Sequence, residues 1–258
     1  MVKGLYTAYT GMTNEQHRMD VMTNNLANVT TVGFKKEGTT SQSFQDILAY
    51  RIKDNSVNSH LAYRLGNNNP GVKIGEDYVD YKEGSFRITD NTYDLALSGD
   101  GFFAIEFTNK AGETSTKYTR AGQFTLNREG YLVTEEGDYV LDVRNNRIQI
   151  DTLLDSIIDE NGNISQNGRV VAQIGVFDFD DYNYLDRYGE TYFEPIAGAE
   201  AYLTNNAQIH SGYLEMSNVS SVQEMVNLIA ITRQYESNQK VIQTLDGTLE
   251  QAVQLGKL

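Results

Sequence analysis

Residues 219–255 read VSSVQEMVNLIAITRQYESNQKVIQTLDGTLEQAVQL, a stretch without proline in which large apolar residues recur every seven positions. Two rows at heptad spacing predict one long helix with an apolar seam along its length. The polar member of the second row, Asn238, is expected to set the register of packing more than to add stability. The seam consists of Leu228, Tyr235, Ile242 and Leu249 in the first row and Ile231, Leu245 and Ala252 in the second.

The start of this helix carries more apolar surface than a single seam needs. Four further apolar residues widen the stripe, so we expect two contacted faces there. They are Val222, Met225, Val226 and Ile229. Just before them, Ser217 or Asn218 is expected to cap the helix, because short polar side chains bind the free backbone N–H groups of a first turn.

The N-terminal stretch from Gly4 to about Asn28 repeats the heptad pattern. Its main row is Leu5, Met12, Met19 and Leu26. Glu15 interrupts the companion row, and Gly11 lowers the helix propensity. The two terminal helices could simply pack on each other as a hairpin. The C-terminal helix, however, has more apolar surface than one partner covers, so we also expect it to contact a neighbouring copy of the chain.

Between the two ends the pattern changes from helical to alternating. Phe103 and Ile105 alternate with Phe102 and Ala104, which predicts a strand with one face better buried than the other. Similar short runs separated by Gly and Asn turns predict an antiparallel β domain over residues 80–211. Residues 35–79 are polar and are expected to form an extended connector with a short helix at Phe44–Ile52. The fold class is therefore α+β, with residues 1–34 and 212–258 forming a coiled-coil-like helical domain.

Composition limits the possible partners. Lys and Arg total 21 against 35 Asp and Glu, a formal net charge of −14, which disfavours nucleic acids and anionic membranes as partners. Absence of cysteine excludes disulfides, thiol nucleophiles and Cys-based metal sites. The N-terminus lacks the apolar core of a secretory signal, and no apolar run approaches the ~20 residues that span a bilayer.

No constellation in the sequence predicts catalysis. His17, His60 and His210 lie in separate segments without metal-ligand spacing, and none of the common nucleophile, phosphate-loop or zinc motifs is present. We therefore expect no enzyme activity, no cofactor, no metal and no small-molecule substrate.

The acidic, tyrosine-rich run over residues 178–194 leaves two questions open. As a calcium site it fails the EF-hand template, because Tyr182 and Asn183 stand where a ligand and the turn glycine belong, so a solvated loop is favoured. Its tyrosines suit either stacking on a sugar or another subunit, or packing on their own domain. These are Tyr182, Tyr184, Tyr188 and Tyr192.

Three blocks in this order resemble the flagellar rod and hook protein family. The first is NNLANVTTVGFK at residues 24–35, the second DLALSGDGFF at residues 94–103 with YTRAGQF at residues 118–124, and the third GYLEMSNV at residues 212–219. In the first block, Gly33 is expected in a left-handed turn, with Phe34 anchoring the exit from the helix. The signature residues are Asn25, Ala27, Asn28, Gly33, Phe34, Gly99, Gly101, Phe102 and Phe103.

The resemblance implies a structural subunit that polymerises with itself and with other flagellar rod and hook proteins. It also implies export through the flagellar type III apparatus without signal cleavage, to an extracytoplasmic basal body. Length and the third block favour the distal rod subfamily, and the proximal rod subfamily stays open. From other classes, a cell-surface glycan-binding β domain on a helical stalk is the main alternative, and an envelope hydrolase is disfavoured.

Overall fold

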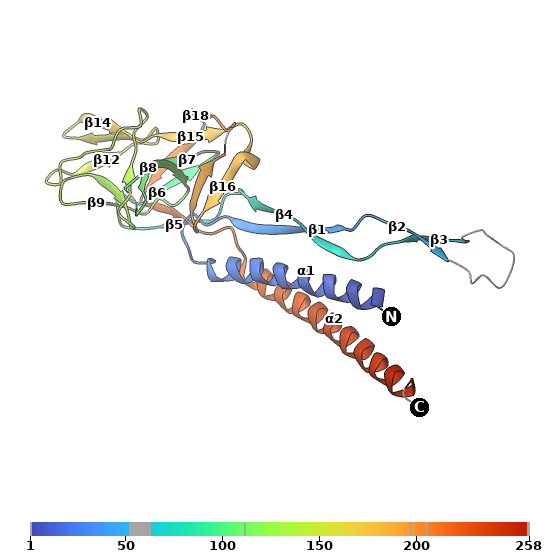
Figure 1. Cartoon of the computed structure of the whole chain (residues 1–258). Helices are drawn as coiled ribbons and strands as arrows, with labels where there is room; N and C mark the ends of the chain where they lie inside the picture. The colour runs from blue at the N-terminus through green and yellow to red at the C-terminus, as the bar shows by residue number, and fades with distance from the viewer. Residues whose placement is uncertain (1, 52–62, 111, 197, 205, 257–258) are drawn as a thin grey trace. The chain divides into compact units, whose positions relative to one another are not determined.

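The computed structural model describes residues 2–51, 63–110, 112–196, 198–204 and 206–256 (Figure 1). Long helices at the two ends of the chain enclose a β-rich middle in the sequence, which confirms the predicted α+β class. The helices are α1 (Val2–Ala27) and α2 (Ser221–Leu255), with a short 3-10 helix η1 (Tyr182–Tyr184). Neither α1 nor α2 carries, within the residues described, an apolar stretch that could cross a bilayer.

The chain folds into two compact units, each built from separate stretches of sequence. Unit 1 comprises Met1–Leu26, Glu37–Tyr78 and Ser221–Leu258, and unit 2 comprises Ala27–Lys36 and Val79–Ser220. The backbone therefore passes from one unit to the other four times. Because both units are discontinuous in sequence, neither can be completed until distant segments of the chain have met.

Unit 1 contains both long helices and two strand pairs. Strand β1 (Lys36–Ser43) pairs with β4 (Val72–Asp80), and β2 (Ile47–Arg51) pairs with β3 (Tyr63–Asn68). Polar side chains of α1 bind strand β1 and the segment before β4: Asn14 Nδ2 donates to Ser41 Oγ at 3.0 Å, and Thr7 Oγ1 donates to the Pro70 carbonyl at 3.0 Å. The face of α1 that contacts these strands is therefore polar, which no apolar pattern could indicate.

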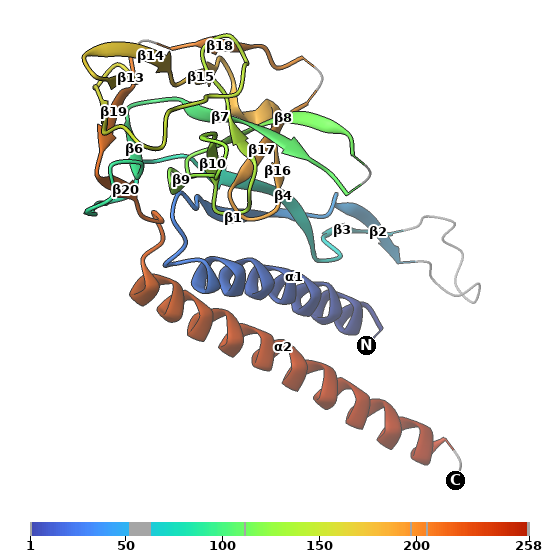
Figure 2. The ribbon, with the colours of Figure 1, turned by 90° about the vertical axis from the view of Figure 1, so that its left-hand side faces the viewer.

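The two helices of unit 1 run in opposite directions. A Cβ at Gly4 would lie 3.6 Å from Leu245 Cδ1, and one at Gly11 would lie 3.1 Å from Asn238 Nδ2. Residues later in α1 therefore lie beside residues earlier in α2, which makes the two helices antiparallel. The small glycines allow this approach, and Asn238 lies against one of them. The ribbons of α1 and α2 move apart towards the two chain ends in both Figures 1 and 2. Continuous coiled-coil pairing therefore stays a prediction.

The short helix predicted at Phe44–Ile52 is wrong. Residues 47–51 form strand β2, which pairs antiparallel with β3. Short apolar runs such as Ile47–Leu48 fit either structure, and the hydrogen-bonding partner decides between them. That partner strand starts at Tyr63, too far along the chain for the pattern of residues 44–52 to indicate it. Residue 52 itself lies outside the described residues.

Unit 2 is built around strand β7 (Phe102–Thr108), which lies inside a nine-stranded sheet. The sheet runs β16-β17-β8-β7-β11-β10-β9, with β15 pairing both β7 and β18. Its other strands are β8 (Thr114–Thr119), β9 (Phe124–Leu126), β10 (Leu132–Thr134), β11 (Tyr139–Val140), β15 (Val176–Phe179), β16 (Leu185–Tyr188), β17 (Tyr192–Pro195) and β18 (Ala201–Leu203). The smaller sheets of unit 2 pair β12 (Ser156–Ile158), β13 (Asn163–Gln166) and β14 (Arg169–Gln173), then β6 (Leu95–Ser98) with β19 (Gln208–Ser211), and β5 (Phe86–Ile88) with β20 (Tyr213–Glu215).

Both faces of β7 are buried over its first four residues, whereas the sequence predicted that one face would be better buried than the other. Phe103 belongs to an apolar cluster with Phe124 and Leu132, whereas Phe102 belongs to a second cluster with Phe193. Each of these five side chains is at most 1% exposed. Side chains that alternate along β7 therefore point into two different apolar clusters, and neither face of the strand is open to solvent at these residues.

A backbone contact in unit 2 gives a test of its packing. A Cβ at Gly122 would lie 1.7 Å from the Leu95 carbonyl oxygen, a backbone atom that cannot turn aside. We expect Gly122→Ala to destabilise the protein by about 1–3 kcal/mol or more, as overpacking does. A Cβ at Gly247 in α2 would meet no atom within 4 Å, so Gly247→Ala should instead be neutral or stabilising by about 0.5–1 kcal/mol. Urea unfolding followed by circular dichroism distinguishes the two, and equal effects would contradict this packing.

Candidate functional site

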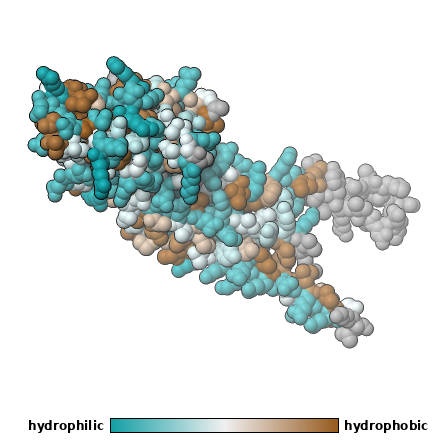
Figure 3. All heavy atoms as spheres, turned by 60° about the vertical axis from the view of Figure 1, so that its left-hand side comes forward, coloured by the Kyte–Doolittle hydropathy of each residue, from teal (hydrophilic) through white to brown (hydrophobic). Residues whose placement is uncertain are grey.

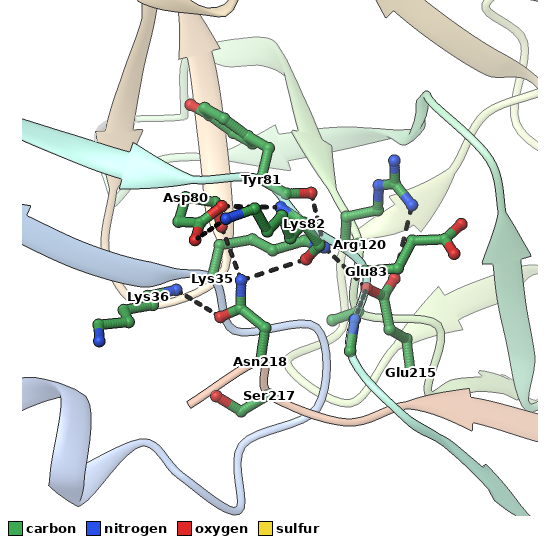
Figure 4. Close-up of polar contacts among 12 residues, drawn as sticks. Lys35, Lys36, Asp80, Tyr81, Lys82, Glu83, Arg120, Glu215, Ser217 and Asn218 are labelled. Carbon is green, nitrogen blue, oxygen red and sulfur yellow. Dashed lines mark hydrogen bonds and ion pairs between the residues drawn. The ribbon is translucent and has the colours of Figure 1, made fainter. Parts of the chain in front are cut away.

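Three charged side chains, one from each family-like block, meet inside unit 2 (Figure 4). Lys35 Nζ lies 2.7 Å from Glu215 Oε1, and Arg120 NH1 lies 3.5 Å from Glu215 Oε2. The three residues are 1%, 2% and 0% exposed, for Lys35, Arg120 and Glu215 respectively. Lys35 and Glu215 are 180 positions apart in the sequence. This charge cluster is therefore where the beginning, middle and end of unit 2 are joined.

Backbone groups supply several hydrogen bonds of the charge cluster, whereas Glu215 Oε2 and the Nε and NH1 atoms of Arg120 are buried without a hydrogen-bond partner among the described residues. The Lys35 ammonium also donates to the carbonyls of Tyr81 at 3.2 Å and Lys82 at 2.7 Å. Glu215 Oε1 accepts a bond from the Gly84 N–H at 3.0 Å. Burying a charge is costly unless it is paired and hydrogen-bonded, so these contacts are what make the cluster possible in the core.

Charge is not balanced within the cluster, because two cations share one carboxylate. Burial lowers the pKa of the Lys35 ammonium, while the Glu215 carboxylate opposes that shift and the Arg120 guanidinium reinforces it. Arg120 is held in addition by a 2.9 Å bond from NH2 to the Gly99 carbonyl and by the Phe102 ring, whose centroid is 5.3 Å from Cζ. Glu215 is thus the one group whose loss would leave two buried cations facing each other.

The first block enters the charge cluster through a tight turn. Gly33 has φ +69°, which confirms the predicted left-handed turn. A Cβ there would lie 2.3 Å from the Ala121 backbone nitrogen, and the Gly33 N–H donates to the Glu215 carbonyl at 2.8 Å. Phe34 is fully buried, as predicted for the anchor of this exit. Only glycine combines this conformation with so close a backbone approach.

Asn218 forms hydrogen bonds that link its own segment to two other segments of the chain beside the charge cluster (Figure 4). Its Oδ1 accepts from the Lys36 N–H at 2.8 Å, and its Nδ2 donates to the carbonyls of Asp80 at 2.7 Å and Lys82 at 3.1 Å. The expectation that Asn218 or Ser217 caps α2 is therefore wrong, since the helix begins at Ser221 and Asn218 is used elsewhere.

The other signature residues are structural. In unit 1, Asn25 is fully buried and bonds both backbone groups of Glu37, at 2.7 Å and 2.9 Å. In unit 2, Asn28 Oδ1 accepts from Thr31 Oγ1 at 3.1 Å, and Ala27 is exposed. Gly99 and Gly101 have φ +98° and +138°, and Phe102 and Phe103 fill the two cores.

The predicted assembly seam is mostly half-buried in unit 1. This holds for Leu5, Met12, Met19 and Leu26 in α1 and for Leu228, Tyr235, Ile242, Leu245 and Leu249 in α2, whereas Ile231 is buried at 3% exposure. The wider stripe at the start of α2 is open: Val222, Met225, Val226 and Ile229 are 68%, 45%, 55% and 55% exposed. Figure 3 shows apolar surface along α2 between hydrophilic residues. We call these four residues the open face of α2.

The acidic, tyrosine-rich run is folded and not a loose loop. It holds η1 and the hairpin β16–β17, and its Asp178 carboxylate accepts from the hydroxyls of Tyr182 at 2.8 Å and Tyr202 at 3.2 Å. Burial and this carboxylate raise the pKa of Tyr182. Tyr182 and Tyr192 therefore pack on their own domain, whereas Tyr184 and Tyr188 are exposed at 49% and 43%.

The histidines occupy unrelated places. His17 Nε2 lies 3.0 Å from Asp77 Oδ1 in unit 1, and His210 packs beside Phe86 and Tyr213 in unit 2. His60 lies outside the described residues. In the part of the chain that is described, no group of three or more His, Cys, Asp or Glu side chains is placed to hold a metal ion.

The charge cluster itself was missed by sequence reasoning. Lys35, Arg120 and Glu215 are ordinary charged residues that, by type, belong on the surface. One signal was present: each lies within one of the three family-like blocks, next to residues that are buried in the core. This position within the blocks could indicate that the three side chains are buried. It could not indicate that they pair with one another, because they are distant in sequence.

Comparison with known proteins gives consistent matches over the chain. Family models match in three places: "Flagella basal body rod protein" at residues 5–35, "Flagellar hook protein FlgE/F/G D1 domain" at residues 96–172, and "Flagellar basal body rod FlgEFG protein C-terminal" at residues 210–255. A relative from Bacillus subtilis (strain 168), "Flagellar basal-body rod protein FlgG", is 34% identical over 99% of both chains. In Caulobacter vibrioides, a FlgG relative is 33% identical over 98% of this chain and 99% of its own, and a FlgF relative is 32% identical over 100% of both.

Removing the shared anion of the charge cluster should destabilise the protein far more than removing a carboxylate that is only partly buried. We expect Glu215→Gln to destabilise the protein by about 3–5 kcal/mol, because it leaves buried cations without their partner. Glu106 pairs with Arg147 at 2.6 Å near the surface of unit 2, where Glu106→Gln should cost about 1 kcal/mol or less. Denaturant unfolding of the two variants measures this difference. Similar losses would show that the buried charges do not depend on Glu215.

Proposed function

Because the chain belongs to the flagellar basal-body rod protein family, we propose that it polymerises helically with copies of itself to form the distal part of the rod. Family membership makes it a structural subunit of the bacterial flagellar basal-body rod and not an enzyme. The glycan-binding and hydrolase alternatives have no support in these matches.

The open face of α2 is the observation that supports self-assembly. Four large apolar side chains on one side of the helix are exposed to water. Burying each aliphatic side chain is favourable by about 1.5–3 kcal/mol relative to full exposure. A subunit that repeats one such contact along a filament gains this at every interface, so a second copy is the partner that best fits the face.

The distal position is favoured by a small margin. Chain length and the block at residues 212–219 favour it, and the FlgG relatives reach 34% identity against 32% for the FlgF relative from Caulobacter vibrioides. The proximal position is the alternative within the same family. Immunogold labelling of purified basal bodies would separate the two, because only a distal subunit should be labelled next to the hook.

Location and partners follow from the same proposal. The rod subunit would contact other rod and hook proteins, and it would reach an extracytoplasmic position through the flagellar type III apparatus.

A charge on the open face tests the assembly contact without disturbing the monomer. Val226 and Ile229 are each 55% exposed, so Val226→Asp or Ile229→Asp should leave the free energy of unfolding within about 0.5 kcal/mol. A carboxylate buried against apolar side chains costs several kcal/mol, so either variant should be exported but fail to form rods. Swimming assays and electron microscopy of basal bodies provide the readout.

The matched control is Gln234→Asp, which adds the same charge on another side of α2. It should be much milder. Normal motility with Ile229→Asp would show that the open face is not buried in the assembly.

Deletion of residues 5–26 separates export from folding. These residues belong to unit 1 alone, so unit 2 retains all of its segments and should remain folded. We expect secretion and motility to be lost, while the strand-rich circular dichroism of unit 2 persists. Secretion of the shortened protein at a normal level would contradict the proposed export role of the N-terminal segment.

A further inference from the structure

Unit 2 contains a cavity of about 510 Å³ that its structural role leaves unused. Aromatic side chains form part of its wall, with ring centroids of Phe107 and Tyr188 5.2 Å apart and those of Phe107 and Tyr192 6.2 Å apart. Glu135, Glu136 and Glu190 also line it. Cavities of this size with aromatic walls and a few charged groups are typical of binding sites.

The charged residues that line the cavity are all acidic. They are three glutamates, and within the described residues none of their carboxylates forms an ion pair. Two cations lie next to the lining, the Lys117 ammonium against the Tyr188 ring and the Arg187 guanidinium against the backbone of Gly189 and Glu190. All three glutamates are exposed, so their carboxylates are accessible to an incoming group. Cations bind both carboxylates and the faces of aromatic rings. Tyr188 already shows this preference, because the Lys117 ammonium lies 3.8 Å from its ring centroid.

Internal bonds hold the walls in place before anything binds. Arg187 Nε donates to the Gly189 carbonyl at 3.2 Å and its NH2 donates to the Glu190 carbonyl, which fixes the turn that carries one glutamate. The Tyr192 hydroxyl donates to Asp138 Oδ2 at 3.1 Å, and Thr119 Oγ1 donates to the Thr191 carbonyl at 2.9 Å. A preformed site loses little entropy when its ligand enters.

We propose that this cavity receives a lysine or arginine side chain from a second copy of the chain in the assembled rod. The inference rests on the proposed self-assembly. Charge complementarity selects the occupant: each copy carries a net charge of −14, so copies repel unless the interface places cations against anions. The chain offers long exposed cations for this purpose, including Lys82, whose side chain is 83% exposed and whose ammonium lies 3.4 Å from Asp80 Oδ2. A volume near 510 Å³ suits such a side chain and its flanking backbone better than a single inorganic ion.

Site-specific photocrosslinking in cells tests this contact in the full-length protein. We would replace Gln123, which lines the cavity, with p-benzoylphenylalanine, and separately replace Gln223, which is exposed on α2. After irradiation of assembled basal bodies, mass spectrometry identifies the crosslinked peptides. We expect the probe at residue 123 to link two copies of the chain through a peptide that contains lysine or arginine.

Neutral variants then test the role of charge. Combining Glu135→Gln, Glu136→Gln and Glu190→Gln should lower the yield of the crosslink from residue 123 by about tenfold or more, the effect of losing ~1.4 kcal/mol of binding. The matched control combines Glu129→Gln, Glu160→Gln and Glu250→Gln, which are exposed and outside the cavity, and should leave the yield unchanged.

The two probes distinguish failure of the cavity from failure of assembly. Crosslinks from residue 223 without any from residue 123 would overturn the cavity proposal and leave the rod subunit intact. Crosslinks from residue 123 to a different protein, or an unchanged yield in the neutral triple variant, would also overturn it. Absence of copy-to-copy crosslinks from both probes would overturn self-assembly and this inference together.

Discussion

The buried carboxylate of Glu215 is the constraint on which the architecture of unit 2 depends. Placing Lys35 and Arg120 in the core is acceptable only because this one anion faces both. An apolar triad could fill the same volume, but it would not require three distant segments to arrive together. Hydrogen-bond geometry makes the meeting specific, since the Lys35 ammonium must also reach two carbonyls near residue 81.

The same cluster explains why the family-like blocks lie where they do in the sequence. Each supplies one charged member together with the glycine or aromatic residue that lets the backbone approach: Gly33 and Phe34 beside Lys35, for example. Motifs that look like three separate signatures are therefore parts of one packed junction. The proposed assembly surfaces lie elsewhere, on the open face of α2 and at the cavity of unit 2, so under these proposals folding and assembly use different side chains.

Much of the fold could be predicted from residue patterns, but the contacts between distant segments could not. Heptad rows predicted α1 and α2 because helix periodicity is local, and alternation predicted β7 and its neighbours. A helix was expected at residues 44–52 because nothing in this local stretch indicates a strand partner, and the partner of β2 begins only at Tyr63. A helix cap was expected at Ser217 or Asn218 because capping is a common local use of serine and asparagine, whereas the actual partners of Asn218 at Lys36 and Asp80 are remote. The charge cluster was missed for the same reason: pairing is a property of the folded chain.

The discontinuity of unit 2 limits how this protein can be divided. A fragment of residues 79–220 would contain most of the β-structure, and by length it looks like a natural domain to excise. It would lack Phe34, leaving an empty core position, and it would lack Lys35, leaving Tyr81, Lys82 and Glu215 without the group that joins them. Any autonomous version must carry residues 27–36 as a covalently attached segment or a separate peptide. The segments that form a folding unit in this chain are therefore those that pack together in space, and they are not consecutive in the sequence.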